Sequence, residues 1–131
     1  MTAVSPPPDA EIARINDLIR RESAAFYTEL AGKTAPGCAH DSNSLRYVLL
    51  RDRAQSLVQR AATTPGDRPM QNAAAGLAKA VDAAERVHER ASATTADPSG
   101  VCMAPGAITL NADAMARATT AIANLQAERS R

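Results

Sequence analysis

The chain contains few aromatic side chains, and this scarcity limits the folds open to it. Tryptophan is absent, and the Phe and Tyr residues are Phe26, Tyr27 and Tyr47 alone. β-Sandwiches favour aromatic and β-branched residues, whereas this chain is rich in alanine, the strongest helix former. The composition therefore predicts helices that pack closely through small side chains. Burial of apolar surface stabilises a fold by about 25 cal/mol per Å², and a core of small side chains buries little of it. A covalent cross-link would therefore matter to the stability of this fold.

The chain also lacks an excess of charge and a long apolar run. Its 15 basic and 14 acidic residues leave a formal net charge of +1. A strong positive field, which binding to nucleic acid or to an anionic membrane surface needs, is therefore missing. No apolar run approaches the roughly 18 residues of a membrane-spanning helix. We expect a soluble protein with no nucleic-acid partner and no membrane insertion.

The length of 131 residues suits one domain with a modest core. We expect residues 1–8 to form a flexible, proline-rich tail and residues 9–131 to form one helical domain. The opening stretch MTAVSPPPDAEIARI has neither the charged nor the apolar region of a secretory signal. The chain is then either a mature periplasmic or secreted protein, with its signal peptide removed and Met1 added, or a cytoplasmic protein. Its cysteines favour the exported form.

Four stretches carry apolar residues at helical spacing, and each opens on residues typical of a helix start. The expected helices cover about 8–31, 41–63, 67–92 and 111–127. The expected opening residues are Pro8 and Asp9, then Asp41, Ser42 or Ser44, then Asp67 with Pro69, and finally Asn111. Helices of about 20 residues with connections of widely different length predict an antiparallel up-down-up-down four-helix bundle, an all-α fold.

One stripe of each helix should face the core. In the first two helices the stripes are Ile12, Ile15, Leu18, Ile19, Phe26 and Leu30, and then Tyr47, Leu50, Ala54, Leu57, Val58 and Ala61. In the last two they are Met70, Ala74, Leu77, Val81, Ala84, His88 and Ala91, and then Met115, Ala118, Thr119, Ile122 and Leu125. These side chains are the predicted core.

The two cysteines lie in loops that this topology brings together. Cys38 belongs to the first connection and Cys102 to the third. In an up-down-up-down bundle these two connections lie at the same end, so we predict a disulfide between them. It would close a loop of roughly 65 residues and contribute about 4 kcal/mol in the chain-entropy model. A stable disulfide is typical of an oxidising compartment.

The same loops allow a second interpretation. Cys38, His40, Cys102 and Met103 together form a set of soft donors that suits Cu(I) or Zn(II). The chain lacks the paired Cys-x-x-Cys spacing of strong metal sites, so this remains the weaker hypothesis. We expect no cofactor.

The patterns of common enzymes are missing from the sequence. There is no G-x-S-x-G, no glycine-rich phosphate loop and no His-Glu-x-x-His. His88, on the apolar line of the third helix, resembles the histidine of phosphotransfer domains in fold only, because Ala91 and Ser92 stand where that family has Lys and Gly. Glu85 and Glu89 could suggest a di-iron bundle, but such a site needs carboxylates from four helices. We expect a protein that is not an enzyme, with a buried, hydrogen-bonded His88.

A row of arginines marks one face of the second helix. Arg46, Arg53 and Arg60 repeat every seven residues. They form either a solvated face that pairs with neighbouring acids or a contact surface for an acidic partner. With His40 and Met103 of the cysteine loops, they are our candidates for residues that contact a partner.

By elimination, the sequence favours a noncatalytic, exported helical module that acts through protein contacts, such as an inhibitor or an immunity-type protein blocking a toxin or enzyme. The expected contact regions are residues 35–41 and 96–108, since loops on a rigid scaffold commonly carry binding, and then the arginine row. A homodimer through the alanine-rich third helix is compatible with this function. The alternative is a cytoplasmic protein whose cysteine loops respond to redox conditions or bind a soft metal.

Overall fold

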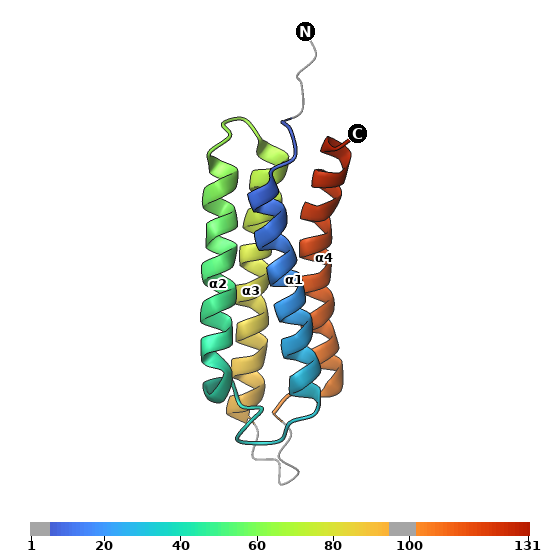
Figure 1. Cartoon of the computed structure of the whole chain (residues 1–131). Coiled ribbons are helices and arrows are strands. Elements are labelled where there is room, and N and C mark those ends of the chain that lie inside the picture. The colour runs from blue at the N-terminus through green and yellow to red at the C-terminus, as the bar shows by residue number, and fades with distance from the viewer. Residues whose placement is uncertain (1–5, 95–101) are drawn as a thin grey trace.

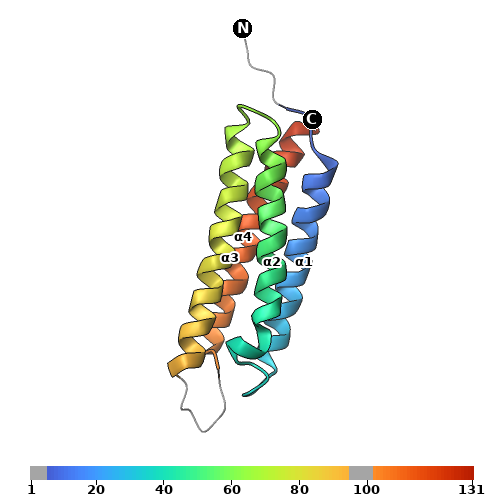
Figure 2. The ribbon, with the colours of Figure 1, turned by 90° about the vertical axis from the view of Figure 1, so that its left-hand side faces the viewer.

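The protein forms an all-α four-helix bundle, as predicted from the periodicity (Figure 1). The computed structural model describes residues 6–94 and 102–131. The helices are α1 (Ala10–Ala31), α2 (His40–Ala62), α3 (Arg68–Thr94) and α4 (Pro105–Arg129). Helix α1 contacts α2 and α4, and α3 contacts the same two helices. Each helix runs antiparallel to its neighbours in sequence, and the start of α1 and the end of α4 lie at the end opposite the α1–α2 loop (Figures 1 and 2).

Asp9 and Asp67 start two of the helices. The Asp9 carboxylate accepts hydrogen bonds from the backbone N–H groups of Glu11 and Ile12, at 2.9 and 3.2 Å. Asp67 accepts from the N–H of Met70 at 3.4 Å. Side-chain acceptors of this kind satisfy N–H groups that have no partner within the helix. The predicted starts of α1 and α3 are therefore correct to within a residue or two, with Pro8 lying just before α1.

The start of α2 is predicted to within one residue, but none of its expected capping residues caps it, and the predicted start of α4 is wrong. Helix α2 begins at His40, after Ala39, which has no side-chain cap. Ser42 instead donates to the carbonyl of Pro36 at 2.7 Å, so it fastens the preceding loop. Helix α4 begins at Pro105, six residues before Asn111. Proline suits the first turn of a helix because its missing N–H would have no partner there, and the Pro-Gly pair had indicated a loop.

The predicted stripes form the core. Of the 24 stripe residues (6 in α1, 6 in α2, 7 in α3 and 5 in α4), all but a few are buried. The exceptions are half-buried: Leu18, Val58, Ala91, Ala118 and Leu125. Buried residues that the stripes did not include are Asn16, Ser23, Tyr27, Asn43, Asp67, Asn111 and Gln126, and in the loops Cys38, Cys102 and Met103. Most of these residues are polar, so each must find a hydrogen-bond partner inside the bundle.

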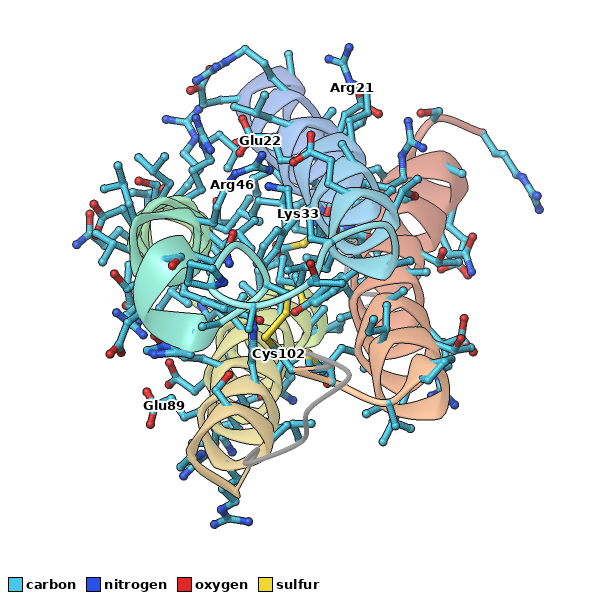
Figure 3. All side chains as sticks on the ribbon, turned by 90° about the horizontal axis from the view of Figure 1, so that it is seen from below. Arg21, Glu22, Lys33, Arg46, Glu89 and Cys102 are labelled. Atoms are coloured by element: carbon cyan, nitrogen blue, oxygen red, sulfur yellow. A yellow bond between two sulfur atoms is a disulfide. The ribbon has the colours of Figure 1, made fainter. Side chains whose placement is uncertain are left out.

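The predicted disulfide is present. Cys38 in the α1–α2 loop is bonded to Cys102 in the α3–α4 connection, with their Cα atoms 5.6 Å apart. Seen from this end, the four helices occupy the corners of a square and the disulfide lies between them (Figure 3). We call this end of the bundle the disulfide pole. Part of the expected contact region 96–108 lies outside the described residues.

Candidate functional site

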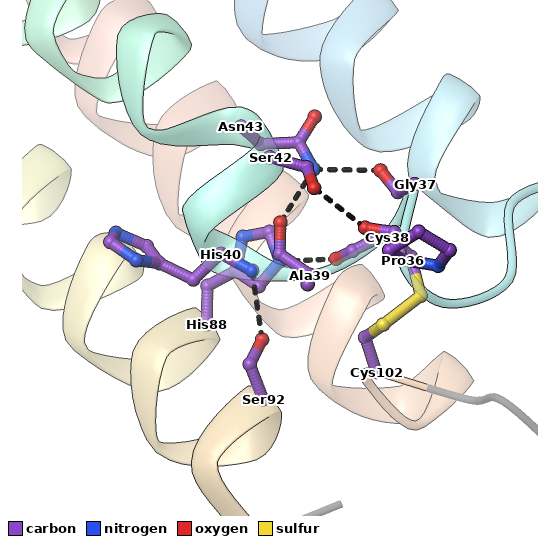
Figure 4. The surroundings of a disulfide bond; sticks show 10 residues. All are labelled: Pro36, Gly37, Cys38, Ala39, His40, Ser42, Asn43, His88, Ser92 and Cys102. Carbon is purple, nitrogen blue, oxygen red and sulfur yellow. Dashed lines mark hydrogen bonds between the residues drawn. A yellow bond between two sulfur atoms is a disulfide. The ribbon is translucent and has the colours of Figure 1, made fainter.

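The α1–α2 loop is held in place by hydrogen bonds at the disulfide pole (Figure 4). The Asn43 amide donates to the carbonyls of Gly37 and Ala39, at 2.9 and 2.8 Å. The backbone N–H of His40 donates to the Ser92 hydroxyl of α3 at 3.0 Å. Together with the disulfide, these bonds fix the loop and the first turn of α2 on the bundle.

His88 connects this loop to the core. It is fully buried, and its Nε2 donates to the carbonyl of Cys38 at 2.7 Å. Because a carbonyl can only accept, Nε2 carries the proton, and in the neutral ring Nδ1 accepts from the Tyr47 hydroxyl at 2.8 Å. Burial lowers the pKa of His88 below its ordinary value, against the effect of the Cys38 hydrogen bond. The ring is therefore neutral, as this chain of hydrogen bonds requires.

The chain of hydrogen bonds continues into α1 and α4. The hydroxyls of Tyr47 and Tyr27 lie 3.3 Å apart. Tyr27 is also hydrogen-bonded to Asn111, whose amide donates to the carbonyl of Ala84 at 3.1 Å. Burial raises the pKa of Tyr27 to about 12 and raises that of Tyr47 as well, so both phenols stay protonated. The buried network thus takes one side chain from every helix.

His40 lies at the edge of this network and faces acids of α3. Its Nε2 is 2.9 Å from Glu85 Oε2 and 3.4 Å from Glu89 Oε1. Its Nδ1 is 3.4 Å from Asp41 Oδ1. Arg51 pairs with the other oxygen of Glu85. Burial disfavours the charged ring, but the hydrogen bonds with Glu85 and Asp41 outweigh it and raise the pKa of His40.

The structure brings two of the four predicted soft donors together. Cys38 and Cys102 are joined as a disulfide, so neither sulfur is a thiolate here. Met103 is buried beside them and lines a hollow of about 250 Å³ with Leu30 and Ile108. His40 points its Nε2 to Glu85 and Glu89 instead. The sequence grouped His40 with the cysteines, whereas the structure pairs it with acids of α3.

The arginine row pairs with two acids of α1 and with Asp9, which caps that helix. Arg46, Arg53 and Arg60 form ion pairs with one acid each along the helix, namely Glu29, Glu22 and Asp9. Arg46 and Glu22 lie between α1 and α2 in Figure 3. Arg51, on the other flank of α2, pairs with Asp82 and Glu85 of α3. The row is thus a set of partly exposed interhelical pairs, each expected to contribute about 0–1 kcal/mol.

Three apolar side chains on the outside of α2 have no place in the core. Leu45 is 68% exposed, and Val48 and Leu49 are each 41% exposed. They lie three and four residues apart, on one side of the helix. We call them the α2 apolar face. Leu49 also borders a hollow of about 220 Å³ that Phe26, Arg46, Leu50 and Arg53 line. The spacing of these residues outside the core stripe was the signal in the sequence that could have identified this face.

The chain matches no protein-family model, and it has no significant similarity to a curated protein or to a solved structure. Within residues 6–94 and 102–131, none of the helices has both the length and the apolar character needed to cross a membrane. Evidence on function therefore comes from the geometry of the chain itself.

Proposed function

We propose that the protein is a noncatalytic helical module that works outside the cytoplasm and binds another protein through the α2 apolar face. An inhibitor or an immunity-type protein, which blocks a toxin or an enzyme, has this kind of role. The observation that carries the proposal is the exposure of Leu45, Val48 and Leu49 on one side of a helix. Large apolar side chains gathered on a surface commonly mark a site of protein contact.

The start of the face lies beside a turn that hydrogen bonds hold on the bundle. Leu45 follows directly on the turn that Ser42 and Asn43 fasten to the α1–α2 loop. The backbone of His40 is fixed to α3 through Ser92. A surface that is already ordered loses less entropy on binding, so more of its contact energy appears as affinity.

The shape of the face fits a helix of the partner. Apolar residues three and four apart on α2 form a ridge, and the hollow beside Leu49 can take a side chain from an opposing helix. Arg46 and Arg53 border this hollow and are still partly exposed in their pairs with Glu29 and Glu22. An aliphatic residue flanked by an acidic one would complement both features.

The disulfide supports the assignment outside the cytoplasm, where such bonds persist. The test is the intact mass of protein taken from its native compartment, with and without reductant and an alkylating reagent. We expect a mass two hydrogens light and no thiol that reacts before reduction. Two reactive thiols would contradict export and favour the alternative of a cytoplasmic protein that responds to redox conditions.

The binding face can be tested by photo-crosslinking in the producing cell. A benzophenone amino acid replaces Leu49 in one variant and Gln59, exposed on the same helix roughly 15 Å away, in the control. We expect a crosslinked adduct of one size at position 49, lost when Leu45→Asp is added, and none at position 59. Equal adducts at both positions, or none at 49, would contradict the proposed face.

A second copy of the chain is the alternative partner of the α2 apolar face. The mass of the crosslinked adduct distinguishes a second copy from another protein. Sedimentation velocity of the purified protein checks the same point. We expect a monomer across the micromolar range. A dimer that Leu49→Asp dissociates would assign the α2 apolar face to self-association and overturn the proposed partner.

A further inference from the structure

His40, Glu85 and Glu89 form a compact group of metal-binding donors on the side of the disulfide pole. His40 is the first residue of α2, and the two glutamates lie four residues apart near the end of α3, on one side of that helix. One donor atom from each lies within 4.8 Å of the other two. The spacing of these residues along the chain gives no sign that either glutamate meets His40.

The imidazole is oriented for binding through Nε2. Its ring stacks on Tyr47, with centroids 5.8 Å apart, and contacts His88 edge to face. Asp41 Oδ1 lies 3.4 Å from Nδ1, so a proton on Nδ1 leaves the Nε2 lone pair facing the glutamates. A carboxylate behind the histidine is the usual support of a metal-binding imidazole, because it fixes the tautomer and the ring orientation.

Glu85 is oriented by a comparable contact. Its Oε1 is paired with Arg51, which leaves Oε2 directed at His40. The Glu85 side chain is only 14% exposed, as is that of His40, whereas Glu89 is 52% exposed. Two of the three donors are therefore held within the structure, and the third is free to close on a bound ion.

The spacing of the donors suits a small tetrahedral ion. Metal–ligand bonds of about 2.0–2.2 Å in a tetrahedron place neighbouring donor atoms roughly 3.3–3.6 Å apart. The 3.4 Å from His40 Nε2 to Glu89 lies in this range, whereas the 2.9 Å to Glu85 is a hydrogen-bond distance, so these two side chains separate by a few tenths of an ångström when an ion binds. A single proton on Nε2 can be donated to one of these carboxylates at a time, whereas a divalent cation binds both and offsets their mutual repulsion.

We propose that His40, Glu85 and Glu89 bind one Zn(II) ion. A mixed set of imidazole and carboxylate donors suits zinc better than magnesium or calcium, which prefer oxygen alone. A hollow of about 500 Å³ borders His40 and Glu89, so water can supply the fourth ligand. The ion would join the first residue of α2 to α3. This site is independent of the α2 apolar face and is tested without a partner.

The test is calorimetric titration of the full-length, disulfide-bonded protein with Zn(II) at neutral pH. We expect saturable binding of one ion per chain and a rise in the melting temperature when zinc is added. Glu89→Gln, the most conservative change at the most exposed donor, should weaken binding roughly tenfold or more, as should His40→Gln. The control is Glu128→Gln, on an exposed residue of the last turn of α4, which should bind like the wild type.

Three results would overturn the proposal. The first is the absence of saturable zinc binding, in which case the group is an ion pair only. The second is unchanged binding by both His40→Gln and Glu89→Gln when their circular dichroism without zinc matches the wild type. The third is displacement of zinc by an equal concentration of Mg(II) or Ca(II), which would mean a site for hard cations.

Discussion

His88 of α3 donates a hydrogen bond to the backbone carbonyl of Cys38, so the disulfide loop is fastened to the core by a side chain as well as by a sulfur bond. The two links are adjacent but chemically independent. Reduction breaks the sulfur bond and not the hydrogen bond, whereas replacing His88 removes the hydrogen bond and not the sulfur bond. Their separate contributions can therefore be measured.

Replacing His88 should destabilise the bundle strongly. His88→Phe fills a similar volume but leaves the carbonyl of Cys38 and the hydroxyl of Tyr47 without this partner. We expect the free energy of unfolding to fall by about 2–4 kcal/mol, because buried polar groups then lack hydrogen bonds. Urea denaturation measures the change, with Tyr47→Phe as the milder comparison. A loss below about 0.5 kcal/mol would show that the network contributes little.

Removing the disulfide should lower the free energy of unfolding more than replacing His88 does. The double variant Cys38→Ser, Cys102→Ser opens a loop with a sequence separation of 64 residues. The chain-entropy model gives a loss of about 4 kcal/mol, since the unfolded chain regains the freedom that the bond had removed. Wild-type protein denatured in urea with reductant should match the variant. If both differ from the oxidised protein by less than about 1 kcal/mol, the entropic account fails.

A buried ion pair joins Arg129 and Asp67 at the end of the bundle opposite the disulfide pole. Losing one partner should lower the free energy of unfolding. Arg129 binds both oxygens of Asp67, at 2.6 and 3.0 Å, and the two side chains are 7% and 4% exposed. Arg129→Met leaves a buried carboxylate uncompensated, and we expect a loss of about 3–5 kcal/mol. Adding Asp67→Asn to this variant should recover part of the lost stability. The control Arg14→Met, in an exposed pair, should change stability by at most about 1 kcal/mol.

Asp9 should make the free energy of unfolding depend on pH in the acid range. Burial tends to raise the pKa of Asp9, but the Arg60 hydrogen bond and the N–H groups of α1 together lower it. A carboxyl whose pKa is lower in the folded state stabilises the fold above its unfolded pKa of about 3.9, and this stabilisation disappears as the pH falls through the folded value.

Asp9→Asn tests this dependence, because asparagine keeps the helix cap and removes the charge. We expect the variant to be less stable than the wild type at pH 7 and the difference to shrink below about pH 4. Urea denaturation at a series of pH values measures it. A difference that does not vary with pH would mean that Asp9 acts through hydrogen bonds alone.

The sequence was sufficient for the topology and for the disulfide, because both follow from the spacing of apolar residues and the order of the connections. It was insufficient for the polar contacts between helices. The start of α2 depends on Ser42 and Asn43, which bind the loop before them and do not cap the helix. Helix periodicity gives the face of a residue but not its level along the bundle, so the meeting of His40 with Glu85 could not be predicted.

The position of His88 in the sequence did indicate a buried, hydrogen-bonded side chain. A histidine on an apolar line must have partners for both nitrogens, and Tyr47 is the polar side chain on the facing stripe of α2. Tyr27 and Asn111 gave less indication, because Tyr27 lies beside its stripe and Asn111 was assigned to a helix start. Because α4 begins at Pro105, Asn111 lies inside the helix and is buried against the other members of the network.

The ion pairs on the two flanks of α2 also select the handedness of the bundle. A second, mirror-related arrangement of four antiparallel helices keeps every neighbour and the same core stripes, and it still brings Cys38 and Cys102 to one end. In it, however, α1 and α3 exchange sides of α2. Arg53 would then lie away from Glu22, and Arg51 away from Asp82. The charge pairs on the two flanks of α2 therefore favour the observed arrangement over one that the order of the helices and the disulfide also allow.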